Sequence, residues 1–171
     1  AAALALAESF IEADALFFNR ADDSNGAIGD AIRAGCQLWL KAASRCESPA
    51  AEWPARIAAL AGADEYGARE ELLCSANLLL SEPALRALVA SYEAELDDAL
   101  AQTRPAGERV NWPAGKASAA LSLLSEALRD ADVLVRSTLK RSPSPNVVQV
   151  ERFVRAFLDY GHPEGALPWL E

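Results

Sequence analysis

The nine prolines of this 171-residue chain constrain its fold most strongly, because all of them fall at junctions between amphipathic runs. Proline has no backbone N–H, so it is accepted at the first position of a helix or after its end. Between these junctions apolar residues recur every three to four positions, and no run keeps the period of two that is typical of strands. The pattern therefore predicts an all-α fold with essentially no sheet.

The junctions divide the chain into seven or eight expected helices. Helices joined by short turns and apolar on more than one side are typical of stacked antiparallel pairs, so we expect an irregular α-solenoid in a single domain, 1–171. A sub-boundary is possible in the 103–110 linker. The Trp-Pro openings at 53–54 and 112–113 suggest a degenerate repeat. The expected helices cover about 2–19, 27–46, 53–62, 66–77, 82–102, 112–140, 146–160 and a last short stretch from 163.

The net charge of −9 is unevenly distributed. Residues 1–100 hold 7 basic and 17 acidic side chains, whereas 101–171 hold 9 and 8. Nucleic acid and an anionic membrane would be repelled at long range, so we expect neither as a partner. No run approaches the roughly 18 apolar residues that cross a bilayer. The acidic surface either serves solubility or selects a basic protein or peptide; the oligomeric state is left open.

Two compositional features bear on the origin of the chain. It contains no methionine and begins inside a helical pattern, so we expect a fragment of a longer protein. An excess of alanine, and of arginine over lysine, favours a bacterial source with a GC-rich genome. The three cysteines are odd in number and match no zinc-ligand spacing, which favours free thiols in a reducing cytoplasm.

The least generic stretch is the polar turn between the first two expected helices. Asp22, Asp23, Asn25 and Asp30 lie around Gly26 and offer oxygen ligands for a cation. An EF-hand is excluded, because with Gly26 at its sixth position two required carboxylates are absent. The alternatives are a looser cation site, or a tight turn in which Gly26 takes a positive φ and a polar side chain caps the next helix.

The same stretch carries a family resemblance. Residues 17–20 (FFNR), followed by 22–26 (DDSNG) and 28–30 (IGD), resemble the signature of an uncharacterised, mostly helical family of bacterial proteins, a domain of unknown function. The closing segment 160–171 is similar to the downstream region of that family. The resemblance implies further helices beyond both ends and transfers no catalytic residue. Residues 161–167 (GHPEGAL) also look like a tetratricopeptide-type turn.

Candidate functional residues are few. Glu93, Glu95, Asp97 and Asp98 crowd the last turns of one helix, against the preference of its dipole, and so form a candidate interaction surface. His162 is the single histidine, and no Glu-x-x-His motif is present, so we expect neither a catalytic residue nor a cofactor. The sequence favours a non-enzymatic helical scaffold or adaptor that binds through its acidic surface. The alternatives are a regulatory or sensor segment whose ligand or catalytic part lies elsewhere, and an enzyme that uses a cation at the polar turn.

Overall fold

The computed structural model describes residues 2–47, 50–102 and 110–170. These residues contain helices and turns but no strand, which confirms the all-α prediction. The chain divides into two compact units, Ala1–Leu85 and Arg86–Glu171, and the division falls inside one continuous helix. All but the last residue of the 103–110 linker lies outside the described residues. None of the described helices is long and apolar enough to cross a membrane.

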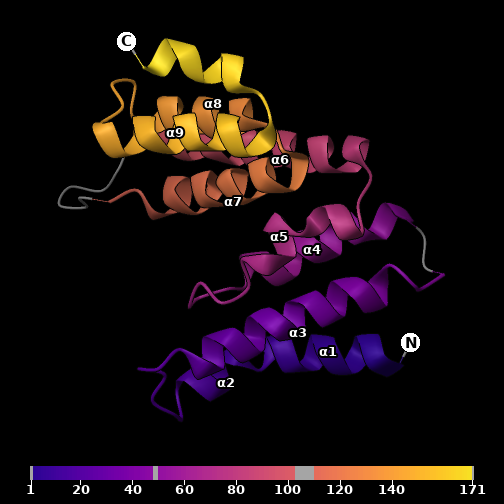
Figure 1. Ribbon diagram of the computed structural model, residues 1–171. Helices are drawn as coiled ribbons and strands as arrows, with labels where there is room; N and C mark the ends of the chain where they lie inside the picture. The colour runs from indigo at the N-terminus through magenta and orange to yellow at the C-terminus, as the bar shows by residue number, and fades with distance from the viewer. Residues whose placement is uncertain (1, 48–49, 103–109, 171) are drawn as a thin grey trace. The chain divides into compact units, whose positions relative to one another are not determined.

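Unit 1 packs its longest helix against the helices before and after it. In Figure 1, α1 lies alongside α3, and α5 in turn contacts both α3 and α4. Fully buried apolar side chains, among them Ile11, Trp39 and Ile57, form the core between these helices. The elements are α1 (Ala2–Glu12), α2 (Asp14–Phe18), α3 (Ala27–Ala43), η1 (Ala50–Glu52), α4 (Trp53–Gly62), α5 (Glu71–Cys74) and η2 (Ala76–Leu78).

The expected helix 2–19 is broken at Ala13, where α1 ends and α2 begins. The break coincides with a buried charge. Asp14 accepts hydrogen bonds of 2.8 and 2.6 Å from Nε and Nη2 of Arg69, and both side chains are almost completely buried. Arg69 also donates to the carbonyl of Leu60 at 2.9 Å. The carboxylate and guanidinium thus have partners, as charges removed from water require.

The expected helix 66–77 is wrong over its first turn. Asp64 acts as the centre of a loop instead of capping a helix, because its carboxylate accepts hydrogen bonds from the N–H groups of all four residues 66–69. Gly67 has a φ of +72°, a left-handed conformation that glycine adopts readily. The loop delivers Arg69 to Asp14, and only then does α5 begin.

Unit 2 consists of helices that pack against their neighbours in the chain. Figure 1 shows α7, α8 and α9 side by side, and η3 lies on α9. Such packing suits stacked helix pairs, but the solenoid itself stays a prediction. The elements are α6 (Glu82–Ala101, which starts in unit 1), α7 (Trp112–Leu128), α8 (Ala131–Arg141), α9 (Val147–Tyr160) and η3 (Pro163–Trp169).

The expected helix 112–140 is two helices. Arg129 takes a left-handed conformation with φ of +52° and closes α7, and Asp130 then caps α8 by accepting the N–H of Asp132 at 3.2 Å. Because the chain reverses here, apolar residues on two sides of the expected long helix pack into one core. A left-handed arginine is uncommon, so the helical periodicity concealed the turn.

The first turn of α9 also differs from expectation. Asn146 and Gln149 form a capping box, each accepting the other's backbone N–H. Val147, expected inside, is 84% exposed, while Phe153 and Phe157 are buried. Trp112 likewise leaves the core at 72% exposure, although it opens its helix with Pro113 as predicted.

Candidate binding cleft

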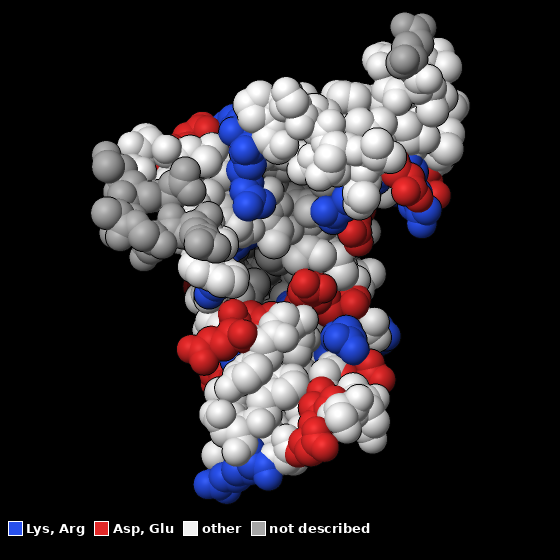
Figure 2. All heavy atoms as spheres, turned by 90° about the vertical axis from the view of Figure 1, so that its left-hand side faces the viewer, with Lys and Arg blue, Asp and Glu red and all other residues white. Residues whose placement is uncertain are grey.

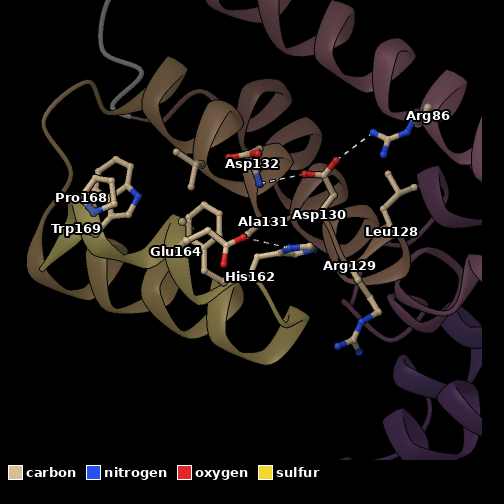
Figure 3. Close-up of a pocket in the computed structure, with 13 residues that line it drawn as sticks. Arg86, Leu128, Arg129, Asp130, Ala131, Asp132, His162, Glu164, Pro168 and Trp169 are labelled. Carbon is tan, nitrogen blue, oxygen red and sulfur yellow. Dashed lines mark hydrogen bonds and ion pairs between the residues drawn. The ribbon is translucent and has the colours of Figure 1, made fainter.

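Unit 2 contains a cleft of about 700 Å³. It lies where the turn between α7 and α8 meets the 3₁₀ helix η3, and Figure 3 shows its labelled side chains converging from these two segments. The lining residues that matter below are Arg86, Arg129, Asp130, Asp132, Val135, Phe157, His162, Glu164, Gly165 and Trp169.

Two local features hold η3 at the rim of the cleft. Gly161 ends α9 with a φ of +87°, and His162 donates its N–H to the carbonyl of Phe157 at 2.8 Å, so the chain folds back on the helix. At Gly165 a Cβ atom would lie 2.4 Å from ring carbons of Phe157. Only glycine therefore allows η3 to pack this closely on α9.

The floor of the cleft is apolar. Val135 and Phe157 belong to a buried cluster with Phe153, and Trp169 packs against it. The rings of Phe153 and Trp169 lie 4.9 Å apart, edge to face, an arrangement that aromatic pairs favour. A ligand entering the cleft therefore meets aromatic and aliphatic surface beneath its charged rim.

The two arginines of the cleft are already engaged. Arg86 lies 3.0 Å from a carboxylate oxygen of Asp130, whose other oxygen caps α8. Arg129 donates to the carbonyl of Asp159 at 2.7 Å and lies over the ring of Tyr160 at 5.9 Å. These contacts satisfy much of the positive charge within the protein.

The negative charge of the cleft is less engaged. Asp132 is exposed, and its carboxylate forms no hydrogen bond or ion pair with any described residue. Glu164 is 3.6 Å from Nδ1 of His162, an attraction that acts only when the imidazole is protonated. Figure 3 shows Asp132 and Glu164 on different segments of the same cleft. The site thus offers two carboxylates above an apolar floor.

The candidate acidic surface on α6 is only partly available. Glu93 pairs with Arg136 at 3.2 Å, and the Asp97 carboxylate lies 2.7 Å from Nζ of Lys140, so both join α6 to α8. Glu95 and Asp98 are exposed without such partners among the described residues. Figure 2 shows the consequence on one face, where acidic and basic side chains lie next to one another at several places.

The polar turn acts as a helix cap. Asp23 accepts the N–H groups of Ile28 and Gly29 at 2.7 and 3.1 Å, and Gly26 has a φ of +74°, so the predicted turn with a capping side chain is confirmed. The other candidate ligands are used locally: Asp22 accepts from Ser24, Asn25 from Ala27, and Asp30 pairs with Arg33. Within 2–47, 50–102 and 110–170 no group of three His, Cys, Asp or Glu residues is placed to hold a metal ion.

The cysteines are free thiols, as predicted. Cys36 is completely buried in unit 1, and burial raises the pKa of its thiol to about 12. Cys46 and Cys74 are half-buried.

The sequence did not single out Asp132 or Glu164, although a signal for the first was present. Asp130 is a good N-cap and precedes an apolar run, which would have divided the helix 112–140 and placed Asp132 in a first turn. No comparable signal brings Glu164 beside it, because that proximity depends on how η3 packs on α9.

Comparisons with protein-family models, with curated proteins and with solved structures find no match to this chain. The resemblance to an uncharacterised bacterial family therefore stays a prediction.

Proposed function

We propose that this protein is a non-enzymatic interaction module, a scaffold or adaptor, whose cleft in unit 2 binds a basic segment of a partner protein. The observation that carries the proposal is the pair of uncompensated carboxylates, Asp132 and Glu164, above the apolar floor formed with Trp169. A lysine or arginine has an aliphatic stem and a charged head, so it matches a floor and rim of this kind. The net charge of −9 would assist the encounter at long range.

The cleft replaces the α6 surface as the centre of the proposal. Glu93 and Asp97 already pair with cations of α8, so a ligand would have to displace those contacts. Glu95 and Asp98 lie on a helix surface without a hollow beside them in the described part of unit 2, and exposed ion pairs on open surface contribute little to affinity. The free carboxylates of the cleft are adjacent to apolar surface that a ligand can also bury.

The proposal is tested with two short fluorescent peptides that are identical except that one carries two arginines between leucines and the other glutamines. We expect fluorescence anisotropy to show binding of the arginine peptide only, with an affinity that falls as salt is added. Replacing Asp132 by Asn together with Glu164 by Gln should weaken binding by roughly tenfold or more, equivalent to about 1.4 kcal/mol.

The matched control is the double variant Glu95→Gln with Asp98→Asn, which removes the same charge from α6. It should change binding by less than about twofold if the cleft is the site, since long-range attraction alone is screened by salt. Equal losses in the two double variants would show that only net charge attracts the peptide. Absence of binding by the arginine peptide would reject the cleft as a site for basic segments.

A further inference from the structure

Unit 1 contains a second hollow, of about 400 Å³, that the cleft proposal does not use. It lies between the α1–α2 segment and the first turns of α3. Phe10, Leu16 and Phe17 form one side, and Ile28 and Ile32 form the other. Apart from one arginine, every side chain that lines it is apolar, so we refer to it as the apolar groove.

The apolar groove is shallow and open along α3. Ile32 at its base is fully buried, but Ala27 and Ala31, one helical turn apart, are exposed, and Leu16 is 47% exposed. A small compact ligand would leave much of its surface in water here, whereas pockets for such ligands enclose most of them. An amphipathic helix suits an open groove, because it covers the opening while its apolar side chains fill the hollow.

The charge at the rim indicates which helix would fit. Arg20 lines the apolar groove, is exposed, and its guanidinium forms no hydrogen bond or ion pair with any described residue. Arg33 and Arg56, the nearby arginines of unit 1, each pair with a carboxylate instead. An acidic side chain on the bound helix would complement Arg20 and discriminate against the basic partners expected for unit 2.

We propose that the apolar groove of unit 1 docks an amphipathic helix of a partner protein, with apolar residues at i, i+4 and i+7 in the groove and an acidic residue against Arg20. This inference concerns a different site and a different class of partner from the cleft in unit 2, and it does not rest on the function proposed above. The two sites together would give the chain two independent docking points of opposite charge preference.

The test is selection from a displayed library of helical peptides in which three positions, i, i+4 and i+7, vary among apolar residues and the flanking positions vary freely. Against the unaltered protein we expect enrichment of peptides that carry Glu or Asp at one flank. Ala31→Trp, which fills the groove from an exposed position, should weaken an enriched peptide at least tenfold. Ala27→Glu gives a second block of the same groove should the tryptophan disturb the fold.

The matched control is Ala59→Trp, at an exposed helical position of unit 1 outside the groove, which should leave affinity unchanged. Arg20→Glu should reverse the preference at the flank from acidic to basic. The proposal is overturned if no peptide is enriched, if both groove variants bind as tightly as the control, or if the Arg20 variant keeps the acidic preference. Binding of phosphatidylglycerol–phosphatidylcholine vesicles, lost in Ala31→Trp, would also overturn it in favour of a lipid surface.

Discussion

The two units obtain the same helical architecture from different kinds of polar contact. In unit 1 buried or half-buried charges join residues far apart in the chain: Asp14 bonds Arg69, and Glu8 accepts from both Arg56 and the Trp39 indole. In unit 2 the long-range ion pairs are exposed, and the helix ends are fixed by adjoining residues, as at Asn146. Side-chain caps that satisfy a helix end locally can be read from sequence, whereas a buried pair 55 positions apart cannot.

The largest test of this difference removes one partner of the buried pair. Asp14→Ala leaves the Arg69 guanidinium buried without its counter-charge and should cost about 3–5 kcal/mol of unfolding free energy. Urea unfolding can follow unit 1 through Trp39 and its neighbour Trp53 once both tryptophans of unit 2 are replaced by phenylalanine.

The control is the exposed pair of unit 2. Asp97→Ala should cost no more than about 1 kcal/mol, because Lys140 remains hydrated. Replacing Asp14 by Leu and Arg69 by Met together should recover much of the lost stability. Comparable losses in the two single variants would contradict the contrast between the units.

A second comparison uses two tightly packed glycines. Gly165→Ala in unit 2 should cost about 1–3 kcal/mol, since the new Cβ would meet the buried ring of Phe157 at 2.4 Å. Gly35→Ala in unit 1 brings its Cβ to 2.8 Å from the ring of Phe10, which is half-buried and has room to move. The gain of about 1 kcal/mol in helix propensity offsets part of that cost.

Thermal melting of these two variants measures the difference directly. A smaller loss for Gly165→Ala than for Gly35→Ala would mean that η3 does not depend on close packing against α9, and would weaken the account of how the cleft is built.

A third comparison removes one cap from each unit. Asn146→Ala breaks the capping box of α9, and Asp23→Ala removes the acceptor for two N–H groups of α3; each should cost about 1 kcal/mol. Chemical denaturation with the probes above should assign each loss to its own unit. A loss from Asp23→Ala that appears only after calcium is added would instead return the turn to a cation-binding role.

The smallest effect concerns alkaline pH. Because folding raises the Cys36 pKa to about 12 from 9.0, the stability that depends on its protonated thiol is complete below pH 9 and is lost as pH rises toward 12. At pH 9.5 the loss should be about 0.8 kcal/mol. Cys36→Ala should flatten this part of the stability curve relative to its own value at pH 8, and an unchanged slope would show that Cys36 ionises freely in the folded protein.

The sequence predicted the fold class because apolar periodicity and proline placement are local properties. It also located the helix starts at Trp53 and Trp112 and the glycine turns at Gly26 and Gly161. It failed where a tertiary contact overrides local pattern, as at Ala13. Of the candidate sites, the polar turn was placed correctly as a structural cap, while the cleft required the reversal at Arg129 that periodicity does not reveal.

Arg129 also bears on how this region could change over evolutionary time. A left-handed position ordinarily favours glycine, and glycine here would relieve the backbone at the end of α7. The same replacement would release the carbonyl of Asp159 and the ring of Tyr160, which the guanidinium now holds. The two effects oppose one another, so drift between arginine and glycine would alter the rigidity of the cleft wall more than total stability. Position 129 is therefore a natural point at which a lineage could tune the selectivity of the cleft while keeping the fold.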